Sequence, residues 1–103
     1  MRVMMKCAMP TEAGNAAIKD GSLGSKIQAI LADLKPEAAY FIAEQGQRVA
    51  VLFFDLKDSS DLPAVAEPWF LAFNAAIEVT PAMTVDDLKK AGPGIEQAVK
   101  NYA

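Results

Sequence analysis

The sequence of 103 residues contains no histidine and a single cysteine, Cys7. Histidine is the commonest acid–base group near neutral pH and the commonest transition-metal ligand. Its absence excludes serine triads and histidine-ligated haem or zinc. One cysteine cannot form an internal disulfide, and alone it supplies no ligand set for structural zinc. We therefore predict no metal and no cofactor, and the cysteine usage agrees with a reducing, cytoplasmic compartment.

The sequence also lacks an excess of positive charge and any long hydrophobic run. Its formal net charge is -3 and its pI is about 4.8. Nucleic acids and anionic membranes attract clusters of Lys and Arg. A membrane span needs about 20 apolar residues in a row. Lys6 interrupts the apolar N-terminal run before a secretion signal could form. We therefore predict no nucleic-acid partner and no membrane association.

What is present favours one folded unit. Hydrophobic residues make up 52% of the chain and charged residues 22%, which is the composition of an ordinary folded domain. The length is that of a single hydrophobic core. We predict one domain over residues 1–103, in which residues 84–103 form a C-terminal helical extension.

Periodicity predicts the first half of the elements. Residues 2–9 alternate, with Val3, Met5, Cys7 and Met9 on one face. After Pro10, a helix capped by Thr11 is expected in two pieces, because Gly21 and Gly24 interrupt it before Leu34. Segments 37–44 and 48–56 then flank residues 45–47, which predict a hairpin turn at Gly46.

The second half is expected to contain a helix, a fourth strand and a C-terminal helical extension. Residues 59–61 offer N-caps to a helix that Pro68 should kink or split. Residues 76–83 predict a fourth strand, placed at a sheet edge because of Pro81. Residues 84–87 resemble a capping box that opens a short helix, and residues 92–94 separate it from a last helical turn or two.

This order predicts an α+β fold with a ferredoxin-like βαββαβ antiparallel sheet and both helices on one face. A two-residue hairpin turn would place Tyr40, Ile42 and Glu44 on the same face as Val49, Val51, Phe53 and Asp55. The helices can cover only the other face. We therefore predict a homodimer in which a second copy covers the first face, with the interface formed by Met4, Ile42, Val49, Val51 and Phe53.

Four segments, residues 9–15, 35–41, 66–70 and 84–90, resemble the dimeric α+β barrel superfamily, and within it a group of small bacterial proteins without an assigned activity. The resemblance implies a ferredoxin-like dimer with a cleft on the sheet, and it implies no particular reaction. Members of known activity include haem-degrading and quinone-forming monooxygenases, lactone isomerases and chlorite-type haem enzymes. Several of these rely on histidine, which is missing here.

The candidate ligand-binding residues are the polar groups expected on the uncovered face together with one aromatic side chain. A cleft of low dielectric could shift their pKa values. The alternative is that Lys6 and Asp55 pair with each other and offset their desolvation. Trp69 beside Pro68 could line a pocket mouth, or it could pack in the core. The set is Lys6, Tyr40, Asp55, Glu78 and Trp69, with Arg2 nearby.

The sequence thus predicts a homodimeric small-molecule-binding domain whose cleft lies on the sheet and takes a small apolar or aromatic ligand. A second hypothesis is a cofactor-free isomerase or monooxygenase that uses Tyr40, Asp55 or Lys6 to move a proton. A third is a protein-interaction module in which residues 92–103 dock on a partner. Cys7 is expected to be a buried, small apolar residue without redox function.

Overall fold

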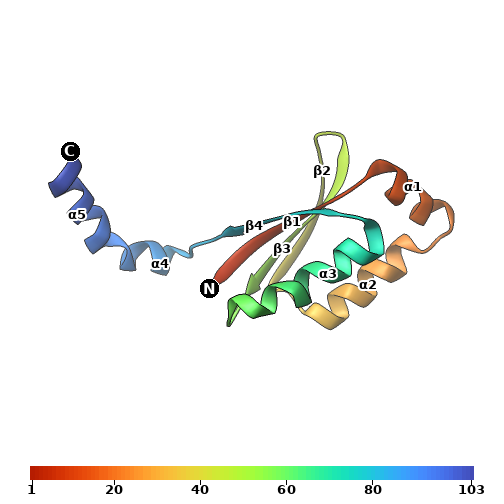
Figure 1. Ribbon diagram of the computed structural model, residues 1–103, viewed down its shortest axis with the longest axis horizontal. Coiled ribbons are helices and arrows are strands. Elements are labelled where there is room, and N and C mark those ends of the chain that lie inside the picture. Colours follow the sequence, from red (N-terminus) through yellow and green to blue (C-terminus); the bar gives the residue numbers. More distant parts are fainter.

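Four antiparallel strands form one sheet in the computed structural model, which describes residues 1–103 (Figure 1). The strands are β1 (Arg2–Met9), β2 (Ala38–Glu44), β3 (Gln47–Asp55) and β4 (Ala76–Pro81). Their order in the sheet is β2-β3-β1-β4, so β2 and β4 are the edges. The edge position predicted for the fourth strand is confirmed.

Helices cover one face of this sheet. They are α1 (Thr11–Lys19), α2 (Leu23–Leu34) and α3 (Leu62–Phe73), which follows a short 3₁₀ helix, η1 (Ser59–Asp61). Two further helices, α4 (Val85–Lys90) and α5 (Gly92–Tyr102), extend away from the sheet (Figure 1). The architecture is a mixed α and β fold that is broadly ferredoxin-like. None of its helices combines the length and apolarity that a membrane crossing requires.

The alternation in β1 decides which face of the sheet packs against the helices. Val3, Met5, Cys7 and Met9 are buried, whereas the residues between them are half-exposed. In the antiparallel register, Met5 lies opposite Leu52 of β3 and Val79 of β4. Period-2 side-chain alternation therefore places the two faces as predicted.

The central hairpin closes through a two-residue turn. Gln45 and Gly46 both have positive φ, 52° and 75°, the backbone of the turn that suits the twist of paired strands. Tyr40 then lies opposite Val51, and Ile42 opposite Val49. The predicted register is confirmed.

The first helical segment forms two helices, α1 and α2, as predicted, but several helices begin at other residues than predicted. The first helical segment is divided at Gly21, whose φ is 79°. Pro10 takes the N-cap position of α1 instead of Thr11, because its extended backbone lets the helix begin one residue earlier than predicted. Asp58 caps η1, and Asp61 closes the reciprocal capping box. The helix α3 runs through Pro68 without a split.

The C-terminal segment departs furthest from the prediction. The capping box between Thr84 and Asp87 is present, as predicted. However, residues 92–94 are the first turn of α5, which continues to Tyr102, and do not separate it from α4. Pro93 has no N–H to lose at this position, where the helix leaves that donor unpaired anyway.

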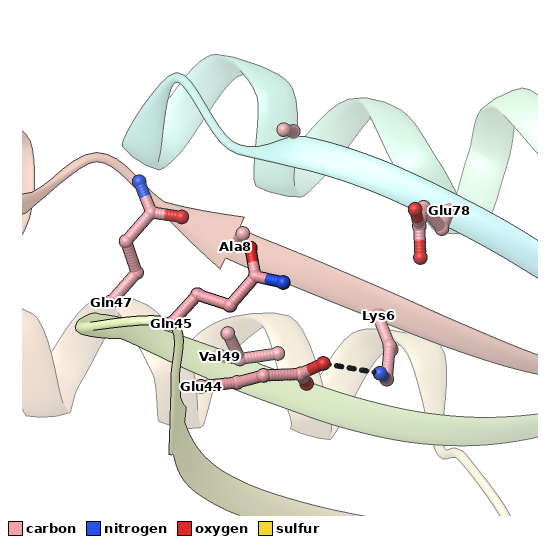
Figure 2. A pocket seen from close by; sticks show the side chains of 8 residues that line it. Lys6, Ala8, Glu44, Gln45, Gln47, Val49 and Glu78 are labelled. Carbon is pink, nitrogen blue, oxygen red and sulfur yellow. Dashed lines mark hydrogen bonds and ion pairs between the residues drawn. The ribbon is translucent and has the colours of Figure 1, made fainter.

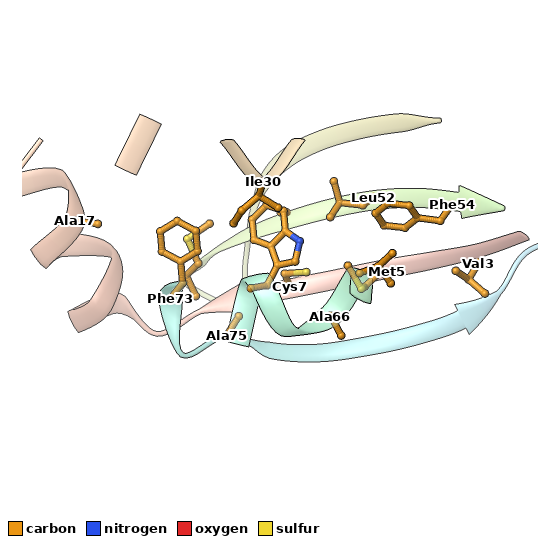
Figure 3. Close-up of a cluster of buried hydrophobic side chains, with 14 residues drawn as sticks. Val3, Met5, Cys7, Ala17, Ile30, Leu52, Phe54, Ala66, Phe73 and Ala75 are labelled. Carbon is orange, nitrogen blue, oxygen red and sulfur yellow. The ribbon is translucent and has the colours of Figure 1, made fainter. Parts of the chain in front are cut away.

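The core lies between α1–α3 and the sheet (Figure 3). Trp69, Phe73, Met5 and Leu52 are at most 1% exposed. The rings of Trp69 and Phe73 lie 6.0 Å apart at 34°, a favourable tilted pair. Cys7 is fully buried in this cluster, as expected, and desolvation raises the pKa of its thiol to about 12.

Candidate functional site

The sheet face opposite α1–α3, here called the open face, carries all five residues of the predicted dimer interface. The registers place Met4, Val51, Phe53, Ile42 and Val49 there. Ile42 is 43% exposed and Val49 only 4%. No helix lies over this face (Figure 1).

A cavity of about 160 Å³ opens on this face beside the tip of the β2–β3 hairpin (Figure 2). Its walls come from β1, β4 and the two hairpin strands, which the sheet order brings side by side. Five of its eight lining residues are charged or carry an amide side chain, and three are hydrophobic. The lining residues are Lys6, Ala8, Glu44, Gln45, Gln47, Val49, Ala76 and Glu78.

Lys6 is the central charge of the cavity. Its Nζ lies 2.9 Å from Glu44 Oε1, and the two side chains reach from β1 to β2 across β3. They pass Val49 (Figure 2), which accounts for the low exposure of that residue. The hydrogen bond from Lys6 to Glu44 raises the pKa of Lys6, as does the charge of Glu78, while desolvation opposes them. Lys6 therefore remains an ammonium group at neutral pH.

Glu78 gives the cavity a net negative charge. It lies directly opposite Lys6 in the register between β1 and β4, and it forms none of the four ion pairs in the structure. One cation beside two carboxylates favours a ligand that donates hydrogen bonds or carries positive charge at one end. Ala8 and Ala76 supply apolar surface for the rest of such a ligand.

Tyr40 shares a row of the sheet with Lys6 but does not line the cavity. The row runs from Glu78 through Lys6 and Val51 to Tyr40. Two strand spacings place the backbones of Lys6 and Tyr40 about 10 Å apart. Tyr40 is 61% exposed, so its ring is available to a surface that covers the open face.

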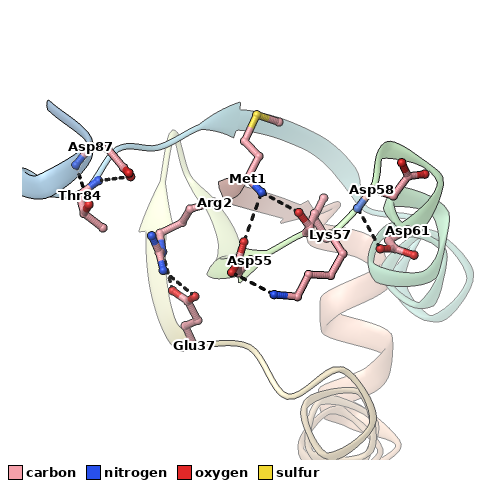
Figure 4. Close-up of polar contacts among 10 residues, drawn as sticks. Met1, Arg2, Glu37, Asp55, Lys57, Asp58, Asp61, Thr84 and Asp87 are labelled. Carbon is pink, nitrogen blue, oxygen red and sulfur yellow. Dashed lines mark hydrogen bonds and ion pairs between the residues drawn. The ribbon is translucent and has the colours of Figure 1, made fainter. Parts of the chain in front are cut away.

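Asp55 lies beside Met1 and Lys57 at the end of β3 (Figure 4), whereas the cavity lies at the other end of that strand, beside the hairpin tip. Its carboxylate accepts a hydrogen bond from the Met1 amino group at 3.3 Å and lies 3.5 Å from Lys57 Nζ. These groups lower the pKa of Asp55, the amino group most. The alternative pairing of Lys6 with Asp55 does not form, because the register sets Asp55 opposite Arg2.

Arg2 lies at the same end of the sheet as Asp55 and forms an ion pair with Glu37. Its guanidinium donates two hydrogen bonds to Glu37, at 2.8 and 3.0 Å. This bidentate contact lowers the pKa of Glu37 and raises that of Arg2. The pair ties β1 to the residue that precedes β2.

Trp69 lies on the helix side of the sheet and does not approach the cavity. Its side chain is 0% exposed, and its Nε1 has no hydrogen-bond partner. Phe70, its neighbour, is 42% exposed and lines a separate apolar hollow of about 260 Å³ with Ile77 and Val79. Trp69 therefore packs in the core and does not line a pocket mouth.

The structure thus brings Lys6 and Glu78 together, sets Tyr40 two strands away, and separates Asp55 and Trp69 from them. Three further residues line the cavity and were not among the predicted site residues: Glu44, Gln45 and Gln47. Glu44 was predicted on the same face as Tyr40, so the alternation gave the signal. Its contact with Lys6 depends on the order of strands across the sheet.

No group of three or more histidine, cysteine, aspartate or glutamate side chains is placed to hold a metal ion. No protein-family model matches the chain, and no curated protein matches it. Among solved structures, the chain is similar to "De novo designed protein Ferredog-Diesel", with a TM-score of 0.46 and 7% sequence identity. The similarity covers 79% of this chain and 85% of that one. It identifies neither a family nor an activity.

Proposed function

We propose that this chain acts as a homodimer joined through its open face, and that the cavity around Lys6 then binds a small molecule. The observation that carries the proposal is an apolar sheet face with no helix over it. Burial of a large apolar side chain is worth about 1.5–3 kcal/mol. Met4, Ile42, Val51 and Phe53 together therefore provide a strong driving force for a second copy to cover the face.

The arrangement we propose is the dimeric α+β barrel, in which two βαββαβ units pack sheet to sheet. Isologous packing about a two-fold axis brings the same patch of each copy together and closes the assembly at two chains. In this arrangement the partner's sheet would also cover the cavity beside the hairpin, and that cavity is open to solvent in the single chain. A roofed cavity excludes water and strengthens each polar contact inside it.

The ligand class follows from the lining. We propose a small amphipathic molecule whose polar end donates to Glu78 while its apolar body lies against Ala8 and Ala76. This ligand class is narrower than the apolar or aromatic ligands predicted from the sequence. The two carboxylates of Glu44 and Glu78 outnumber the ammonium group of Lys6, so the ligand needs a polar end that donates hydrogen bonds. Binding is favoured over proton-transfer chemistry because Lys6 is held as an ammonium by Glu44 and Asp55 is occupied at the far end of the sheet.

Oligomeric state tests the dimer. We expect the chain to sediment as a dimer at micromolar concentration and Val51→Glu to sediment as a monomer. Tyr40→Lys should also sediment as a monomer. Because the Tyr40 side chain is 61% exposed in the single chain, this change should not disturb the fold. Ala29→Glu on the exposed side of α2 is the control and should remain dimeric. A monomeric parent chain, or dimers that tolerate both open-face changes, would contradict the proposal.

Thermal shift tests the ligand. A small-molecule set of amines, amino acids and aromatic acids should contain members that stabilise the chain, by about 2.7 kcal/mol at a hundredfold excess over Kd. Glu78→Gln and Lys6→Met should abolish that stabilisation, and Ala29→Glu should keep it. Stabilisation that survives both cavity changes would place the ligand elsewhere.

A further inference from the structure

The segment after β4, residues 83–103, here called the C-terminal arm, exposes a stripe of large apolar side chains. In α5 the stripe consists of Ile95, Val99 and Tyr102, which are 53%, 58% and 88% exposed. Their spacing of three and four residues places them on one helix face. Helices shorter than about 12–15 residues are marginal in water on their own, and α5 has 11 residues. The stripe therefore needs a surface to cover it.

The body of the same chain does not provide that surface. No residue of α4 or α5 is buried, and the arm points away from the sheet (Figure 1). The radius of gyration is 17.1 Å, whereas a compact chain of this length has about 13 Å. The arm leaves the sheet where Ala82 N–H donates to the Arg2 carbonyl oxygen.

An apolar groove of about 350 Å³ lies between α2 and the edge strand β2, at the other end of the sheet. It is here called the α2–β2 groove. Seven of its eight lining residues are hydrophobic, and Phe41 within it is 50% exposed. The lining residues are Met9, Leu23, Ile27, Phe41, Ile42, Ala43, Arg48 and Val49.

The one charged residue of this groove has no carboxylate partner. Arg48 donates to Asn15 Oδ1 at 3.0 Å and takes part in none of the four ion pairs. Its guanidinium lies against α1 so closely that a Cβ on Gly14 would be 2.6 Å from Nη1. A guanidinium has five N–H donors, and one hydrogen bond, to Asn15, is formed by the Arg48 side chain in the structure.

The arm carries the complementary charge at the edge of its stripe. Glu96 follows Ile95 directly and precedes Val99 by three residues, so it borders the apolar face. It too forms no ion pair in the structure. The groove is apolar with a free cation, and the arm is apolar with a free carboxylate.

We propose that the C-terminal arm of one copy docks in the α2–β2 groove of a second copy, with Glu96 facing Arg48. This inference rests on the proposed homodimer, because the arm needs a second copy to dock on. It adds the C-terminal arm as a second contact between the two chains. Both copies contribute one arm and one groove, so the contact forms twice about the two-fold axis.

Geometry favours docking on the second copy over docking on the arm's own body. The groove lies at the end of the sheet where β1 stops, and the arm leaves at the end where β1 starts. Eight residues of β1 span about 26 Å. From Ala82 to Val85 the chain is not helical and spans about 10 Å, and from Val85 to Glu96 it adds about 16 Å of helix. An arm docking on its own body would therefore have to reverse fully at residues 82–84, away from the direction that it takes in the structure (Figure 1), and run the whole length of β1 to reach Arg48. If the two sheets of the proposed dimer pack antiparallel, the groove end of the partner's sheet comes to the end at which the arm leaves.

Charge reversal tests the pairing in the full chain. We expect Glu96→Arg and Arg48→Glu each to weaken the dimer about tenfold, as measured by sedimentation equilibrium, and the double variant to recover most of the affinity. Asp33→Arg, on the exposed surface of α2, changes net charge as Glu96→Arg does and should leave the dimer unchanged. Single variants without effect, or a double variant without recovery, would overturn the assignment.

Cross-linking tests whether the contact is between chains. Glu96→Cys and Arg48→Cys are prepared separately, mixed, and treated with a short bis-maleimide. Cys7 does not compete while the chain is folded, because it is fully buried. We expect a covalent dimer in the mixture well above that in either variant alone. A chain carrying both cysteines that links only within itself would show instead that the arm folds back.

The two proposals fail in different ways. If Val51→Glu dissociates the dimer while charge reversal and cross-linking give nothing, the sheet-to-sheet dimer stands and the arm assignment is wrong. If charge reversal weakens a dimer that Val51→Glu leaves intact, the arm assignment stands and the open face is not the main interface. A chain that is monomeric and never cross-links contradicts both.

Discussion

Two regions of this molecule use the same kinds of hydrophobic side chain under opposite conditions. In the layer between α1–α3 and the sheet, Trp69, Met5 and Leu52 are fully buried. In the C-terminal arm, Ile95 and Tyr102 are at least half exposed. Both regions have the 3.6 or 2.0 periodicity of elements that bury one face. The core completes its burial within one chain, whereas the arm offers a face that only another surface can complete.

The difference shows that amphipathic pattern and single-chain stability are separate properties. The core residues contribute to the free energy of unfolding of each chain. The arm residues contribute only when something covers them. The following predictions test this division, beginning with the change that should cost most.

Trp69→Ala should lower the free energy of unfolding by about 3–5 kcal/mol, because it leaves a large void among fully buried side chains. Urea unfolding at fixed protein concentration measures the effect. Tyr102→Ala, a similar loss of aromatic area on the arm, is the control at a concentration where the chain is monomeric. Equal effects of the two changes would contradict the division between the core and the arm.

Cys7 should make the core sensitive to alkali. Burial raises the pKa of its thiol from an ordinary value of 9.0 to about 12. Between these values the unfolded chain loses the proton and the folded chain keeps it. Stability is therefore complete below pH 9 and falls by about 1.4 kcal/mol per pH unit above it.

Comparison with Cys7→Ala isolates this effect from other titrating groups. The difference in unfolding free energy between the parent and the variant should change with pH from 9 upward, and it should be constant below. A difference that stays flat to pH 11 would show that the thiol ionises in the folded chain.

Thr84→Ala should unwind the start of the arm without affecting the body. The Thr84 side chain accepts from the Asp87 N–H, and Asp87 accepts from the Thr84 N–H. Loss of such a cap costs a helix about 1 kcal/mol. We expect faster amide exchange in α4 and unchanged exchange in β1 and β3, with Ser25→Ala on α2 as the control.

The same capping box should open in acid. Its hydrogen bonds hold the pKa of Asp87 below the ordinary value of 3.8. Its contribution is therefore complete above that value and is lost as pH falls through the lower folded pKa. A decrease in the helicity of the arm below pH 3.8, absent in Asp87→Asn, would confirm the contribution.

Ile95→Ala should have the smallest effect of all on the single chain. Because Ile95 is 53% exposed, its truncation should change the unfolding free energy of the body by less than about 0.5 kcal/mol. Leu52→Ala in β3 should cost about 2–5 kcal/mol under the same conditions. At concentrations where the chain is dimeric, the effect of Ile95→Ala should increase if the arm docks.

Much of the fold was predictable because the signals are local. Alternation from Val3 to Met9 placed β1 and its buried face, and Gly46 placed the hairpin turn and hence the register. These features depend on backbone geometry over two to four residues. The helix ends were less predictable, since Asp58 and Pro10 compete with neighbouring residues for the cap positions.

The candidate site was predictable only in part. Alternation placed Lys6, Glu78 and Tyr40 on the open face, where they lie. It gave no means to choose Glu44 over Asp55 as the partner of Lys6. That choice depends on the distance between β1 and β2 across β3, and on the Met1 amino group that binds Asp55.

The sequence by itself determined the faces of the sheet, the turn between β2 and β3, and the amphipathic character of the arm. These follow from side-chain periods of 2.0 and 3.6 residues and from glycine at a positive φ, which act over short distances along the chain. Only the tertiary structure decided which charges meet at Lys6 and Asp55, and that the arm leaves its own body. Those outcomes depend on the order of strands and on the direction in which β4 ends, which bring together residues far apart in the sequence.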